Sequence, residues 1–157
     1  MHTTPLSPLQ IKSHRFTNFR VKCVAGGNAA GLPALRPTVW FEPPPSEQGD
    51  WRLVLALEIA SEEPEKPWLY EGEIEIQGVF AIAQGFPEEK KNQLALVNGF
   101  SLLYSSAREM FINLTARSAY GIVSLPTLSF VALVNDLLEA EAKKSAPVEN
   151  DPDAQKV

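Results

Sequence analysis

The chain has 157 residues, a formal net charge of −5 at pH 7, 45% hydrophobic residues and 21% charged residues. This is the composition of a globular domain, and a chain of this length can bury roughly 70% of its unfolded surface. The excess of acids and the lack of a basic run argue against nucleic acid as a ligand, because phosphate binding requires clustered lysine and arginine.

Three observations favour a cytoplasmic protein. The single cysteine, Cys23, cannot form an internal disulfide and suits a reducing compartment. No apolar run approaches the roughly 20 residues that a membrane-spanning helix needs. The first twelve residues lack the charged and apolar regions of a secretory signal.

The composition changes along the chain and divides it into three segments. Residues 1–13 contain proline and serine, and we expect them to be flexible. Residues 143–157 are polar and contain no aromatic residue, so we expect a disordered tail that cannot bury enough surface to fold. The folded domain is predicted over residues 14–142.

The first two predicted strands cover 14–24 and 35–41. In the first, Phe16 falls on one side, and the other side carries Phe19, Val21 and Cys23. In the second, Leu35, Val39 and Phe41 share one face, whereas Trp40 points the opposite way and is expected to be exposed. Pro37 indicates an edge strand or a bulge, because proline cannot donate a ladder hydrogen bond.

Two further strands, 51–60 and 70–82, alternate strictly between apolar and polar residues. One side of the first carries Trp51, Leu53, Leu55, Leu57 and Ile59, and the second places Glu71, Glu73 and Glu75 on a single wet side. A period of two with one apolar side is typical of an antiparallel sheet that is covered on one face.

A long helix is predicted over 87–117, with Pro87 and two glutamates at its start. Its apolar positions form a seam of heptad period that other apolar residues widen: Leu96, Val97, Phe100, Leu103, Tyr104, Ala107, Met110, Phe111 and Leu114. A helix that is apolar on two sides must be covered on two sides. We expect the sheet on one side and either another subunit or a larger core on the other.

An apolar loop, 119–128, follows, broken by Gly121 and Pro126. A second helix begins after it, with Thr127 or Ser129 as a possible cap. Strands followed by helices indicate the α+β class, here a four-stranded antiparallel sheet covered on one face by two C-terminal helices.

The sequence offers little for catalysis. The two histidines are His2, in the flexible segment, and His14, which we interpret as an exposed residue at the start of a strand. Glycine-rich residues 26–31 lack the lysine and hydroxyl of a phosphate loop. We therefore predict no catalytic residue, no metal site and no cofactor, and keep an enzyme or small-ligand protein using His14 and this loop as a remote alternative.

The acidic row Glu71, Glu73 and Glu75 has two interpretations. It can serve to keep a wet sheet face soluble, or it can be a docking patch for a basic partner.

The motifs of the second half resemble those of the SecB family of bacterial export chaperones, over about residues 15–138. The strand end Gln77-Gly78-Val79-Phe80 and the helical segment 103–109 (LYSSARE) resemble the family's Gly-apolar-Phe strand end and its aromatic-x-x-Ala-Arg-Glu segment. The loop 119–128 and the helix at Phe130 follow in matching order and spacing.

The resemblance implies a homotetramer, a dimer of dimers, that binds non-native or precursor polypeptides along an apolar groove without ATP. It implies that client-binding residues come from the first strands, the long helix, the loop and the last helix. The best matches here are Phe16, Phe19, Val39, Trp40, Phe41, Ile122, Val123, Leu125, Leu128 and Phe130. The alternative is that these residues belong to the core, because apolar strand residues are usually buried. It places the subunit interface on the long helix, at Leu96, Phe100, Leu103, Tyr104, Ala107 and Phe111.

The chain also departs from the family. Export chaperones of this kind dock the motor SecA through acids on the sheet, and Glu73 falls near one such acid. However, Arg20 and Lys22 stand where acidic character is expected. The family also docks SecA through its C-terminal tail, and the tail here carries lysines among its acids. The alternative is a dedicated chaperone or adaptor for a single partner, such as a toxin–antitoxin pair, without SecA docking.

Overall fold

The computed structural model describes residues 5–46 and 49–145 and contains one antiparallel sheet with helices on one side. The sheet order is β1-β4-β3-β2, so β1 and β2 are the edges. The strand bounds are β1 Leu9–Cys23, β2 Pro33–Glu42, β3 Trp51–Ser61 and β4 Tyr70–Ile82. This confirms the α+β class and the four-stranded antiparallel sheet.

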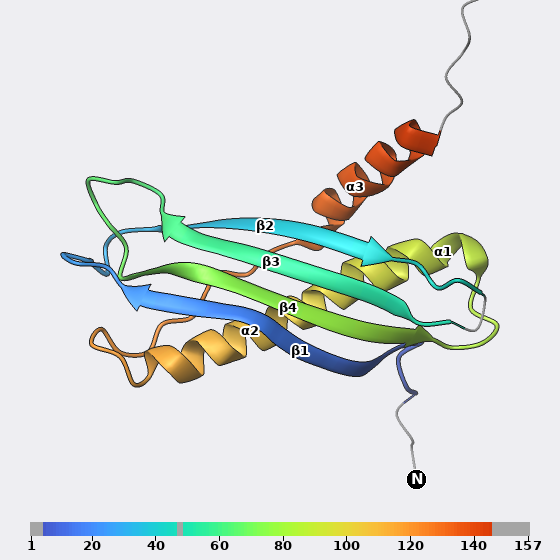
Figure 1. Ribbon diagram of the computed structural model, residues 1–157, viewed down its shortest axis with the longest axis horizontal. Coiled ribbons are helices and arrows are strands. Elements are labelled where there is room, and N and C mark those ends of the chain that lie inside the picture. Colours follow the sequence, from blue (N-terminus) through green and yellow to red (C-terminus); the bar gives the residue numbers. More distant parts are fainter. Residues whose placement is uncertain (1–4, 47–48, 146–157) are drawn as a thin grey trace, which may run out of the picture.

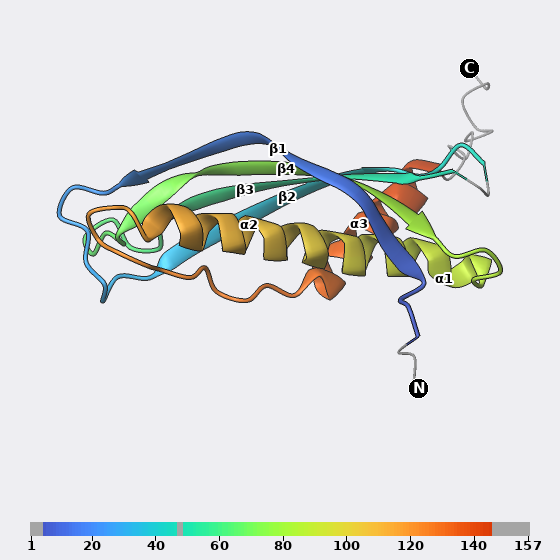
Figure 2. The same cartoon turned by 90° about the horizontal axis from the view of Figure 1, so that it is seen from below.

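The core lies between the inner face of the sheet and a long helical segment (Figures 1 and 2). Alternate residues of β3 and β4 are buried there, including Leu53, Ile76 and Phe80, each fully inaccessible to solvent. Trp51 is buried as well, and Trp40 is 51% exposed on the outer face, as the alternation predicts.

Strand β1 differs from the prediction in the residue at which it begins and in the side of the sheet on which Phe16 lies. It begins at Leu9 rather than His14, so part of the segment that was expected to be flexible pairs with β4. The register shifts around Lys12 and Thr17, and each extra residue reverses the alternation. Phe16 therefore lies on the same inner face as Phe19, opposite buried isoleucines of β4, and not on the other side.

The predicted helix 87–117 is a continuous helical run in three parts: α1 Glu88–Gln93, a π-helical turn η1 Leu94–Asn98, and α2 Gly99–Thr115. It approaches the sheet closely at two glycines. A Cβ atom on Gly99 would clash with a methyl of Leu53, and one on Gly78 would lie 2.7 Å from a methyl of Leu103. Larger residues at these positions would push the helix off the sheet.

The last helix, α3 Phe130–Ser145, begins where the second helix was expected. Only its first turns pack, with Phe130 and Val134 buried and three leucines half-buried. Figure 1 shows that α3 then extends beyond the β2 edge. The sheet is thus covered mainly by one helix rather than two.

The predicted tail 143–157 begins inside α3, whose last turn includes Lys143 and Lys144. The remainder of that segment, like residues 1–4, lies outside the described residues. Among the described helices, none has the length and apolar character needed to cross a membrane.

Candidate functional site

Residues 119–129, which we call the strap, connect α2 to α3 without helix or strand structure. They run back along α2 on its side away from the sheet (Figure 2). Residues 122–126 form no backbone–backbone hydrogen bonds in the described structure. The strap is therefore an extended, apolar segment whose position depends on side chains.

Five side chains hold the strap in place. The Tyr70 hydroxyl donates to the Gly121 carbonyl at 2.8 Å, and the Arg108 Nε donates to the Leu125 carbonyl at 3.0 Å. The buried Thr115 hydroxyl accepts from the Val123 amide at 3.2 Å. The other two are tyrosine hydroxyls, Tyr104 donating to the Pro126 carbonyl and Tyr120 to the Val24 carbonyl.

Tyr104 is a buried anchor, 3% exposed, for the second half of the strap. Burial raises the pKa of Tyr104 to about 12, against a smaller opposite effect of Arg108. The hydroxyl therefore remains protonated and keeps donating throughout the physiological range. Its ring packs edge-on against Phe130, 5.9 Å between centroids, so it links the strap to the start of α3.

The strap presents one apolar side chain inward and another outward. Leu125 is 1% exposed and belongs to the core, whereas Ile122 is 70% exposed. Val123 and Leu128 are half-buried. The strap thus covers the helix and still offers apolar surface to solvent.

The ten residues expected to bind clients do not form one surface. Val39, Leu125 and Phe130 are buried in the core of the single chain, which agrees with the alternative interpretation of these residues as core. Half-buried positions on the inner side are Phe16, Phe19, Phe41, Val123 and Leu128. Ile122 is exposed on the strap, and Trp40 is exposed on the opposite, outer face of the sheet.

The six residues expected at a subunit interface are buried within the single chain, each 3% exposed or less: Leu96, Phe100, Leu103, Tyr104, Ala107 and Phe111. The sheet covers one side of the helix and the strap covers another, so the second cover is intramolecular. Leu102 and Leu114, 42% and 45% exposed, are the large apolar residues that α2 leaves open. Leu102 was missed because serines surround it on that face.

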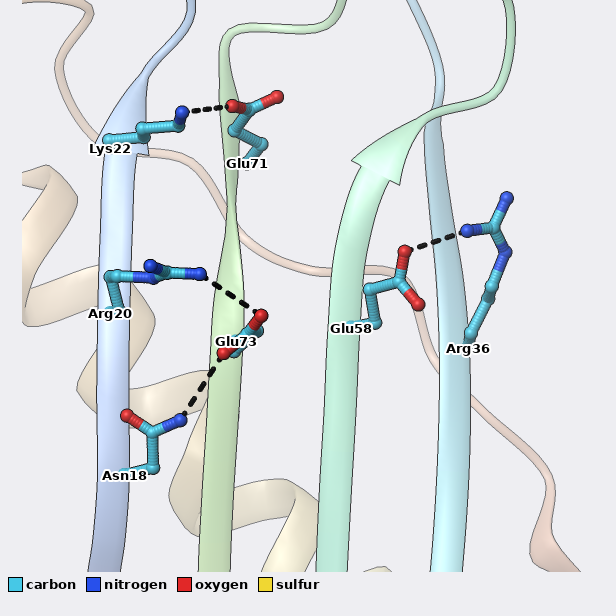
Figure 3. Close-up of polar contacts among 7 residues, drawn as sticks. All are labelled: Asn18, Arg20, Lys22, Arg36, Glu58, Glu71 and Glu73. Atoms are coloured by element: carbon cyan, nitrogen blue, oxygen red, sulfur yellow. Dashed lines mark hydrogen bonds and ion pairs between the residues drawn. The ribbon is translucent and has the colours of Figure 1, made fainter.

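Two of the three acids in the acidic row, Glu71 and Glu73, pair with bases of β1 across the strands, as Figure 3 shows. Lys22 pairs with Glu71 at 2.6 Å and Arg20 with Glu73 at 3.0 Å, while Thr17 bonds to Glu75. These are exposed pairs, so they contribute little stability.

The pairing continues on the other side of the same face. Glu58 lies opposite Glu73, and Arg36 pairs with Glu58 at 2.7 Å (Figure 3). A row of basic, acidic, acidic and basic side chains therefore crosses all four strands. This half of the outer face holds three bases and four acids, of which Glu75 is the acid without a basic partner among the described residues. A docking role for the acidic row stays a prediction.

His14 is exposed on β1 opposite Gly78, and no described side chain forms a hydrogen bond with it. In the part of the chain that the structure describes, no three histidine, cysteine or acidic side chains gather as metal ligands would.

The sheet, the long helix and the strap together define an α+β domain of SecB-like architecture. A family model described as preprotein translocase subunit SecB matches residues 28–141. The chain belongs to the SecB family, which confirms the resemblance to SecB-like chaperones. No curated protein sequence matches the chain.

Solved structures are similar to this chain at low sequence identity. The Mycobacterium tuberculosis SecB-like chaperone Rv1957, solved with a ChAD peptide from the Rv1956 HigA1 antitoxin, is 17% identical with a TM-score of 0.60. The similarity covers 78% of this chain and 91% of that one. A Streptococcus agalactiae protein of unknown function is 10% identical with a TM-score of 0.46, over 76% of this chain and 97% of that one.

Proposed function

We propose that this protein is an ATP-independent holdase that binds extended apolar segments of non-native polypeptides at the strap, without catalysis or cofactor. The observation that carries the proposal is the strap itself. It is extended, lacks backbone pairing over residues 122–126 and exposes Ile122 to 70%. Burying apolar area there supplies about 25 cal/mol per Å² and needs no reactive group.

The strap also explains how a client could be held weakly and reversibly. Its carbonyls at Leu125 and Pro126 already accept from Arg108 and Tyr104, so these bonds fix the strap and leave the outward side chains free. A client segment then contributes apolar contact, reduced by the cost of ordering it. Several such surfaces in one assembly add through effective concentration.

We propose a homotetramer, a dimer of dimers, as that assembly. Two features support it. Leu102 and Leu114 expose apolar surface on α2. β1 is a long edge strand with Ile11 40% exposed, and open edges of this kind favour pairing with another chain. We place the assembly in the cytoplasm, where the exposed free thiol of Cys23 suits the reducing conditions.

A second candidate is a chaperone dedicated to one partner, such as a toxin–antitoxin pair, instead of an export chaperone that docks SecA. Two observations favour it. The acids near the family's docking position are paired with Arg20 and Lys22. The Mycobacterium tuberculosis structure with the similar fold holds a peptide from an antitoxin.

Aggregation of several unrelated unfolded proteins tests both ideas. A general holdase should suppress aggregation of most of them at similar molar ratios, and light scattering should report a tetramer. Suppression limited to one client would support the dedicated role. A monomer that suppresses no aggregation would refute both.

A further inference from the structure

The outer face of the sheet has two unlike halves. One half carries the ion pairs of Figure 3. The other, toward the Trp51 end of β3, holds an open cleft of about 680 Å³ whose lining includes Trp40 of β2, Val54 of β3 and Val79 of β4. Both valines are half-buried and Trp40 is 51% exposed. An apolar floor on a face that otherwise carries charge indicates a contact surface.

The cleft is bordered by two arginines that form no ion pair within the described residues. Arg52 lies opposite Glu42 of β2 without an ion pair or hydrogen bond to it, and Arg15 bonds to the neutral Gln77, at 3.3 Å. In contrast, Arg20, Lys22 and Arg36 each have a carboxylate within 3.0 Å. Glu42 is the single acid lining the cleft. These groups favour an occupant with carboxylates and a small apolar side chain.

One segment of this chain has that chemistry. Residues 146–157 (APVENDPDAQKV) contain three acids, one lysine and two valines. They follow α3, which emerges beyond the β2 edge in Figure 1 and rises toward the level of the sheet in Figure 2. Twelve residues span up to about 40 Å when extended, and Trp40 lies on β2, the strand at that edge.

We propose that residues 146–157 dock in this cleft of their own chain, with their carboxylates near Arg15 and Arg52 and an apolar side chain against Trp40. This is a contact separate from client binding, because the strap lies on the other side of the sheet. Its occupancy would keep the exposed tryptophan away from other proteins while clients bind at the strap.

Trp40 reports on the contact, because Trp51 and Trp68 are each only 4% exposed. Acrylamide quenching is measured on the full chain and on the triple variant Glu149→Gln, Asp151→Asn, Asp153→Asn. We expect the quenching constant to rise about twofold in the variant, because docking covers the exposed half of the ring. If the rise in the quenching constant disappears when Trp40→Phe is added to the triple variant, the rise comes from Trp40.

Substitutions in the cleft separate the possible outcomes. Arg52→Ala should raise quenching as the triple variant does, whereas Arg20→Ala removes one charge from the paired half and should leave it unchanged. Equal quenching in the wild type and the triple variant would overturn the proposal. Protection of Trp40 that disappears on dilution would also overturn it, because the acidic segment would then come from a second copy. A rise in quenching in Arg52→Ala but not in the triple variant would overturn it too, because the cleft would then hold a different occupant.

Discussion

Ile122→Ser should reduce client binding and leave folding intact. Fully burying an isoleucine is worth about 1.5–3 kcal/mol, and Ile122 has 70% of its surface available for burial by a client. The contact is therefore worth about 1–2 kcal/mol, or roughly 5- to 30-fold in the dissociation constant per site. Several sites engaged by one client would enlarge the effect.

Anisotropy of a fluorescently labelled, permanently unfolded client measures this affinity, and thermal unfolding measures stability. The matched control is Leu32→Ser, since Leu32 is 60% exposed in the loop before β2 and is not part of the strap. We expect Leu32→Ser to bind like the wild type and both variants to unfold at the wild-type temperature. If Ile122→Ser binds like the wild type, or if both variants weaken binding equally, the strap is not the client site.

Three more outcomes follow from the same geometry. Arg108→Ala removes a charged donor from the carbonyl of buried Leu125; it should lower the thermal midpoint by about 3–6 °C, and an unchanged midpoint in calorimetry would count against a fastened strap. Because the pKa of Tyr104 is raised to about 12 from 10.0, its deprotonation is disfavoured in the folded chain. Its contribution to stability is complete below about pH 10 and decreases as the pH rises through 12, so denaturant titrations should show a shallower loss in Tyr104→Phe. Leu102→Glu should dissociate the proposed tetramer in light scattering, and persistence of the wild-type mass would place the interface elsewhere.

The alternating strands were predictable because their pattern is local. β3 and β4 bury every second residue, and the printed order of apolar and polar side chains is sufficient to indicate the inner face. The inner face of strand β1 could not be predicted in this way, because its two bulges at Lys12 and Thr17 depend on how it pairs with β4. The reversed facing of Phe16 and the ion pairs of Arg20 and Lys22 both result from that register.

The helix shows a second kind of limit. Its seam correctly indicated that two sides must be covered, but a pattern of apolar residues does not say which partner covers them. The strap fills that role through donors at Tyr70, Tyr104 and Arg108, which lie far from it in sequence. Hydrogen bonds between such distant side chains and backbone carbonyls leave no local signal, so the sequence alone did not decide whether Leu125 lies in the core or in a groove.

The bulges of β1 also bear on how a protein with apolar surface remains dispersed. An uninterrupted edge of this length would template strand after strand and would grow into an open-ended sheet. Lys12 and Thr17 interrupt the ladder and increase the local twist, so a neighbouring edge can match only part of the strand at a time. Growth along the edge is thus self-limiting, and the chain can expose apolar groups to others without polymerising with itself.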